Sequence, residues 1–116
     1  MKSFARTIFI VITFLAQCVF AQQWWEIGTS GFSAGEAHYT SFAIDGTGTP
    51  YVAYQDAANS NKATVMKFNG TDWESVGPLG LTDDEASYTS LAIDRNGIPY
   101  LAFSDSAKSY KATVMK

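Results

Sequence analysis

The sequence has 116 residues, of which 47% are hydrophobic and 16% charged, with a formal net charge of −3. This length suits one small domain, and the hydrophobic content excludes a disordered chain. The acidic balance argues against nucleic acid as a partner, because few basic groups could neutralise phosphates. A single Cys and a single His exclude a Cys/His zinc site and a Ser–His or Cys–His catalytic centre repeated between modules.

Residues 1–21 have the organisation of a secretory signal peptide. Basic residues open the segment, an apolar run follows from Ile8 to Leu15, and Val19-Phe20-Ala21 forms a cleavage site. The uncharged run is shorter than the roughly 20 residues of a membrane-spanning helix, which argues against an anchor. A lipidated Cys18 is the alternative. We therefore expect a secreted or cell-surface protein with no membrane segment after signal removal.

The rest of the chain contains short strand signals, which are runs of β-branched and aromatic residues separated by Gly, Asn and Asp. No window shows the 3.6-residue period of an amphipathic helix, so an all-β fold is predicted. In chain order the expected strands are Trp24–Gly28, Tyr39–Asp45, Pro50–Asp56 and Lys62–Asn69, then Asp72–Gly77, Tyr88–Asp94, Pro99–Asp105 and the run from Lys111 onward.

These strand signals belong to two copies of one unit. Phe32–Lys67 aligns with Leu81–Lys116 without a gap at an offset of 49, with 21 identities in 36 positions. Upstream, Trp25 and Trp73 also correspond, with one residue inserted after the second of them. We divide the chain into a first repeat, residues 22–71, and a second repeat, residues 72–116, which is incomplete at its C-terminus.

Four antiparallel strands in about 49 residues is the size of a β-propeller blade. Along the second strand signal, Phe42 and Ile44 lie on one face while Ser41 and Ala43 lie on the other, and neither face is charged. A blade packs against neighbours on both faces, so this pattern fits. The predicted fold is all-β, with two four-stranded antiparallel blades of a partial propeller.

The hairpin Ala43–Tyr54, with the pattern Asp-x-x-Gly-x-x-Tyr, resembles the repeats of exported bacterial β-propellers and is similar to NHL, kelch-like and sialidase-like blades. The unit through Lys62–Trp73 resembles repeats of large secreted or cell-surface bacterial proteins. The resemblance implies a propeller fold and carries little about activity. The hairpin departs from the sialidase Asp-box, since Asp45 has two residues before Gly48 and Tyr51 replaces the Trp, and no sialidase activity is inferred.

Two blades leave apolar faces and open strand edges, whereas closed propellers have typically four to eight blades. Either the sequence is an N-terminal fragment of a longer repeat protein, or identical chains assemble head to tail into a ring. The second arrangement is similar to that of fucose-binding lectins, in which two-repeat chains form trimeric six-bladed propellers. The expected partners are therefore further propeller blades or identical chains.

Trp24, Trp25 and Trp73 are the candidate ligand-binding residues, because indole faces stack on sugar rings. Trp25 and Trp73 recur at one repeat position, so packing between blades competes with that interpretation. The Asp residues that end the strands are expected to cap hairpins, and His38 is expected in a loop. No catalytic residue, metal ligand or cofactor is predicted.

The sequence favours a non-enzymatic, exported propeller module that acts as a scaffold or recognition surface at the cell exterior. Glycans or surface proteins are its candidate ligands. One alternative is a carbohydrate-binding lectin that closes its propeller by trimerisation. The other is the N-terminal part of a propeller glycoside hydrolase or lyase.

Overall fold

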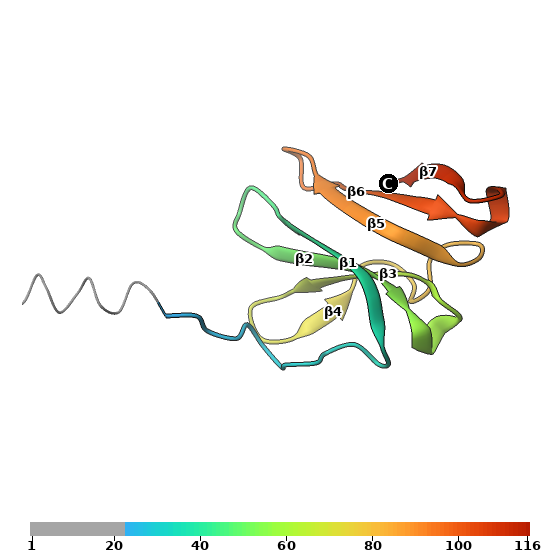
Figure 1. Ribbon diagram of the computed structural model, residues 1–116. Coiled ribbons are helices and arrows are strands. Elements are labelled where there is room, and N and C mark those ends of the chain that lie inside the picture. Colours follow the sequence, from blue (N-terminus) through green and yellow to red (C-terminus); the bar gives the residue numbers. More distant parts are fainter. Residues whose placement is uncertain (1–22) are drawn as a thin grey trace, which may run out of the picture.

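The structure, a computed structural model, describes residues 23–116, so the expected signal peptide and Cys18 lie outside the described residues. Two antiparallel sheets make up the described part (Figure 1). The first has the order β1-β2-β3-β4, with β1 Ala37–Ile44, β2 Pro50–Asp56, β3 Lys62–Phe68 and β4 Trp73–Ser75. The second has the order β5-β6-β7, with β5 Ala86–Ile93, β6 Pro99–Asp105 and β7 Lys111–Met115.

The prediction of an all-β fold with antiparallel strands is confirmed, with one sheet of four strands and one of three. The structure describes no α-helix in residues 23–116, and the only helical pieces there are short 3-10 turns. These are η1 (Ala57–Asn59) after β2 and η2 (Ser106–Lys108) after β6. Among the same residues, no helix has the length and apolarity needed to cross a membrane.

The two sheets repeat each other in local detail. β1 and β5 each contain a bulge at a Tyr with positive φ, Tyr39 at 51° and Tyr88 at 52°. A side chain other than Gly rarely adopts this conformation, so its recurrence marks a required kink in both strands. Asp56 and Asp105 each cap the 3-10 turn that follows, accepting from the backbone amide two residues on. Repetition of the sequence is therefore repetition of structure.

The prediction of a strand at Trp24–Gly28 is wrong, because the structure gives these residues no regular secondary structure. Their counterpart in the second repeat, β4, forms a strand only by pairing with β3, where Phe68 lies opposite Trp73. No strand of the described residues stands in the same relation to Trp25. A strand needs a partner for its backbone hydrogen-bonding groups. Similar sequences around Trp25 and Trp73 therefore form a strand only where such a partner is present.

The pairing also places β4 in the first sheet, although the strand signal at Asp72–Gly77 was expected to open the second unit. The chain therefore passes from the first sheet to the second after Ser75. His38, expected in a loop, lies in β1 opposite Gln55. Its ring pairs with Glu36, whose carboxylate is 3.0 Å from Nε2.

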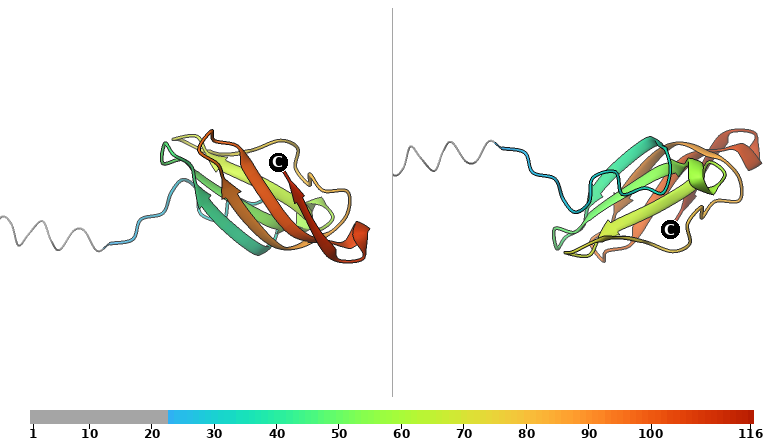
Figure 2. Two further views of the ribbon diagram at one scale, coloured as in Figure 1. Left: turned by 90° about the horizontal axis from the view of Figure 1, so that it is seen from above. Right: turned by 90° about the horizontal axis from the view of Figure 1, so that it is seen from below.

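The sheets stack face to face, and the hydrophobic core lies between them (Figure 2). The buried core residues are Tyr51, Ala53, Ala63 and Val65 from the first sheet and Ala86, Leu91, Leu101 and Phe103 from the second. A hydrogen bond also joins the two sheets, in which Ser41 Oγ accepts from the amide of Leu91 at 2.8 Å. The neighbouring strands β1 and β5 thus hold the sheets in register.

Candidate functional site

The open face of the first sheet, on the side away from the second sheet, carries an apolar groove. Phe42, Val52 and Tyr54 line it together with Phe32 from the preceding loop, and its volume is about 400 Å³. Phe42 is 57% exposed, whereas Tyr54 is only 2% exposed at the base of the groove. We call this surface the outer groove. Exposed aromatic and aliphatic area of this kind marks a contact surface.

The repeat shows what the outer groove is shaped to receive. At the offset of 49, Phe42, Val52 and Tyr54 correspond to Leu91, Leu101 and Phe103. Those three residues are at most 7% exposed, because they pack against the first sheet. The same face is therefore covered in the second sheet, whereas in the first it is exposed at Phe42 and partly exposed at Val52.

The opposite relation holds on the far side of the second sheet. Ala53 and Val65 are buried where the first sheet meets the second, at 0% and 4% exposure. Their counterparts Ala102 and Val114 lie on the open face, and Val114 is 65% exposed. The two open faces are thus the two halves of the interface that already exists between the sheets. Such a pair is heterologous, and it can propagate from one sheet to the next.

β1 and β5 each carry a tyrosine at the bulge, and these two tyrosines contact each other. The rings of Tyr39 and Tyr88 lie 4.4 Å apart at their centroids, with an interplanar angle of 48°. A hydrogen bond with Tyr88 raises the pKa of Tyr39. Thr89 Oγ1 donates to the carbonyl of Tyr39 beside this pair. The strand signals indicated these strands, but no sequence pattern indicated that the bulges would bring the two rings together.

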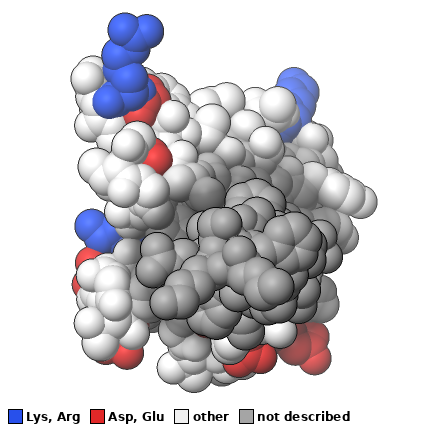
Figure 3. Space-filling view, turned by 90° about the vertical axis from the view of Figure 1, so that its left-hand side faces the viewer, with Lys and Arg blue, Asp and Glu red and all other residues white. Residues whose placement is uncertain are grey.

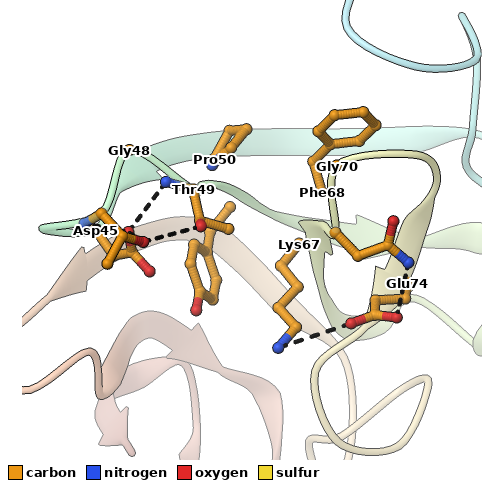
Figure 4. Close-up of a pocket in the computed structure, with 11 residues that line it drawn as sticks. Asp45, Gly48, Thr49, Pro50, Lys67, Phe68, Gly70 and Glu74 are labelled. Atoms are coloured by element: carbon orange, nitrogen blue, oxygen red, sulfur yellow. Dashed lines mark hydrogen bonds and ion pairs between the residues drawn. The ribbon is translucent and has the colours of Figure 1, made fainter.

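A polar hollow of about 450 Å³ lies at the end of the first sheet, where the β1–β2 and β3–β4 turns meet (Figure 4). Lys67 Nζ is 3.7 Å from Glu74 Oε1, and Asn69 donates to the other carboxylate oxygen of Glu74 at 3.1 Å. Asp45 Oδ1 accepts from the amide and hydroxyl of Thr47 and from the amide of Thr49. The hydrogen bond from the Thr47 side chain is the main cause that lowers the pKa of Asp45.

This arrangement supports turn structure more than chemistry. A lowered pKa keeps Asp45 ionised, which is the reverse of what a general acid needs. Lys67 and Glu74 neutralise each other, and the side-chain oxygen of Asn69 is occupied by the amides of Thr71 and Asp72. Within residues 23–116 no three His, Cys, Asp or Glu side chains gather closely enough to hold a metal ion.

The three candidate tryptophans do not converge on one site. Trp73 is half-buried, stacks on Phe32 at 4.3 Å with an interplanar angle of 14°, and donates through Nε1 to the carbonyl of Ile27 at 2.9 Å. Trp25 is 78% exposed and Trp24 is 99% exposed. Trp73 therefore packs the end of the first sheet, while Trp24 and Trp25 lie on a segment that extends away from both sheets (Figure 1).

The strand-ending aspartates have the capping role that the sequence indicated. Asp56 is 1% exposed and accepts from the amide of Ala58, from Asn59 Nδ2 at 2.8 Å and from Thr64 Oγ1 at 2.7 Å. Asp105 accepts from the amide of Ala107 and from Thr113 at 2.7 Å. The oxygens of both carboxylates accept hydrogen bonds from the chain itself and are not free to bind a ligand.

Uncharged residues make up most of the described surface that is visible in Figure 3, and the few Lys, Arg, Asp and Glu side chains seen there are scattered, with both signs present. Comparisons of the chain with protein-family models, with curated proteins and with solved structures found no match.

Proposed function

We propose that this protein is an exported β-propeller module that acts as a scaffold or recognition surface at the cell exterior. Its two sheets are successive blades, and further blades or identical chains are its partners. The observation that carries this proposal is the complementarity of the two open faces, each of which matches a face already buried between the sheets. The signal-like sequence of residues 1–21 supports export.

Repetition explains why such a surface would exist. Phe42 is a large apolar side chain like its buried counterpart Leu91, although Phe42 is 57% exposed and Leu91 only 7%. A monomer that exposes both apolar faces would be less soluble, so we expect these faces to be retained because they contact a partner. The loops at the sheet ends are then left to present a recognition surface on a rigid support.

The experiment is light scattering with circular dichroism on the purified chain and on two variants. Phe42→Asp places a carboxylate in the outer groove, and Asn96→Asp adds the same charge at an exposed turn. The wild-type chain and Asn96→Asp should form β-rich species larger than a monomer, whereas Phe42→Asp should remain folded and lose this association. A wild-type chain that stays a folded monomer at all concentrations would contradict the proposal.

Export is tested separately. A C-terminally tagged chain should be recovered outside the cell or on its surface and should lose residues 1–21, which mass spectrometry of the recovered protein would detect. Retention of an uncleaved chain inside the cell would contradict the exterior location while leaving the packing argument intact.

A second candidate function is carbohydrate binding by a closed assembly of identical chains. Trp24 and Trp25, at 99% and 78% exposure, are the observation that favours it, because each offers a free indole face. The assembled chain is titrated with a panel of glycans while tryptophan fluorescence is followed. Quenching that is lost in Trp24→Phe and Trp25→Phe but kept in Trp73→Phe would support a lectin, and no response from any glycan would reject it.

A further inference from the structure

Two strands of identical sequence have opposite environments. Lys62–Lys67 and Lys111–Lys116 both read Lys-Ala-Thr-Val-Met-Lys. In β3, Ala63 is 0% and Val65 is 4% exposed, whereas in β7 Ala112 is exposed and Val114 is 65% exposed. Sequence cannot cause this difference. The second sheet covers the face of β3, where Ala63 and Val65 join the core, and a further segment covers its edge; among the described residues β7 has neither.

The covering segment of β3 is residues 73–82. Its first part is β4, in which Ser75 lies opposite Met66 and Glu74 lies opposite Lys67. The side chains of Glu74 and Lys67 form an ion pair between the two strands. Its second part continues along the same edge of β3, and its contacts there are Val76 N to Val65 O at 2.8 Å, Leu81 N to Ala63 O at 2.7 Å, and Ala63 N to Thr82 Oγ1 at 3.1 Å.

The chain contains a second segment of this kind, at residues 25–33. Trp25 and Glu26 correspond to Trp73 and Glu74, and Ser33 corresponds to Thr82. The local geometry of the end of the segment is already formed, because Ser33 Oγ donates to Gly35 O at 2.7 Å as Thr82 Oγ1 donates to Asp84 O at 2.7 Å. Its beginning, Trp25–Ile27, has no strand partner among the described residues and is largely exposed, although the carbonyl of Ile27 accepts from Trp73 Nε1 of the same chain at 2.9 Å.

We propose that Trp25–Ile27 of a second copy of this chain adds to the open edge of β7 as its outer strand. This inference rests on the proposed function and names its partner. The register carried over from β3 and β4 places Ile27 opposite Met115 and Glu26 opposite Lys116, so that opposite charges meet. It also brings Ser33 Oγ of the second copy to the amide of Ala112.

Charge and symmetry both favour a second copy as the occupant. Lys116 at the β7 edge and Glu26 on the added segment reproduce the pair that Lys67 and Glu74 form within the chain. Each copy then donates one strand and receives one, at surfaces far apart on the chain. This is a heterologous contact, which closes as a ring or extends as a filament, and it forms beside the face-to-face contact of the outer groove.

The decisive measurement is residue-specific amide hydrogen exchange by NMR on the purified full chain, at dilute and concentrated conditions. The amide of Ala63 is the internal control, because Thr82 accepts from it in every chain. The equivalent amide of Ala112 should exchange at least roughly tenfold more slowly in the concentrated sample, while the rate for Ala63 stays constant.

Charge reversal tests the register. Glu26→Lys and Lys116→Glu should each raise the dissociation constant of the assembly by about three- to tenfold, the range of a partly exposed ion pair turned into a repulsion. The double variant should recover most of that loss. Asp83→Lys, which reverses an exposed charge in the loop before β5, is the matched control and should leave association unchanged.

The outcomes separate this inference from the proposed function. Protection of Ala112 together with recovery in the double variant supports strand addition by a second copy. An assembly that depends on Phe42 but leaves Ala112 unprotected would overturn strand addition and leave the blade-packing proposal standing. A chain that remains monomeric at every concentration would overturn both.

Discussion

Thr64 Oγ1 donates to Asp56 Oδ2 at 2.7 Å across the β2–β3 hairpin, and both side chains are buried. The same bond recurs at 2.7 Å between Thr113 and Asp105 in the second sheet. In each case the carboxylate also caps the 3-10 turn that joins the two strands. One acidic side chain therefore fixes both the turn and the pairing of the strands around it.

Replacing this aspartate should cost more in the first sheet than in the second. Asp56→Ala removes bonds to Ala58, Asn59 and Thr64 at a site that is 1% exposed, and we expect a loss of about 2–4 kcal/mol in the free energy of unfolding. Asp105 has bonds from Ala107 and Thr113 but no counterpart of the Asn59 bond, so Asp105→Ala should lose about 1–2 kcal/mol. Urea unfolding followed by circular dichroism measures both, and equal losses would contradict the assignment.

Gln55 should contribute to the joining of the two sheets. Its amide donates to the carbonyl of Ala86 at 3.0 Å and to Ser87 Oγ at 3.2 Å, both in the second sheet. Gln55→Ala leaves a buried carbonyl unpaired and should lower the free energy of unfolding by about 1–2 kcal/mol. Ser104, at the equivalent position, bonds only within its own sheet. Ser104→Ala is the control in the same urea experiment and should change stability by less than about 0.5 kcal/mol.

Stability should fall in strong base because of Tyr54. Burial, with a smaller effect of the nearby Asp56 charge, raises the pKa of Tyr54 from 10.0 to about 12. The folded state thus keeps the phenol protonated, so its contribution is present below about pH 10 and is lost as the pH rises toward 12. Urea midpoints measured from pH 8 to 12 should fall less steeply for Tyr54→Phe than for the wild-type chain. Parallel curves for the two proteins would show that another group causes the loss of stability at high pH.

The loss of stability at low pH should depend on Asp45. Its pKa is lowered from 3.8, chiefly by the Thr47 side chain and then by backbone amides of the turn. A lowered pKa stabilises the fold above about pH 4, and that contribution disappears as the pH falls through the folded-state pKa. Asp45→Asn should flatten the loss of stability between pH 4 and 2 in the unfolding curves. Carboxyl NMR of Thr47→Val should show the pKa of Asp45 moving upward, and an unchanged pKa would refute this cause.

Trp73 and Trp24 should respond very differently to truncation. Trp73→Ala removes the stack on Phe32 and the bond to the Ile27 carbonyl, and we expect a loss of about 2–3 kcal/mol. Trp24→Ala removes a side chain that is 99% exposed and should change stability by less than about 0.5 kcal/mol. Thermal and urea unfolding of both variants at low protein concentration would measure this difference, and a destabilising Trp24→Ala would reveal a contact that a single chain does not make.

Much of the fold could be predicted because its signals are local. The runs of β-branched and aromatic residues at Pro50–Asp56 and Pro99–Asp105 indicated both central strands to the residue. Asp45 and Asn69 indicated their turns, since a short side chain that bonds the following amides acts within a few residues. The expected caps at Asp56 and Asp105 form for the same reason.

The candidate site could be predicted only in part, because its features depend on contacts between distant residues. The tryptophans attracted attention by their chemistry, but burial separates Trp73 from Trp24 and Trp25. Gln55 carried no signal, since its partner Ala86 is 31 positions away. The outer groove is likewise defined by which face the second sheet leaves open.

The sequence by itself determined the repeat, the strand-rich composition and the turns, because propensity and hydrogen bonding within a turn act over a few residues. Only the tertiary structure decided which strand pairs with which. It placed Trp73 beside Phe68 at the edge of the first sheet and left Trp25, in the same local sequence, without a strand. The physical reason is that another segment must satisfy a strand's backbone groups and another sheet must cover its side chains, so identical residues are buried in β3 and exposed in β7.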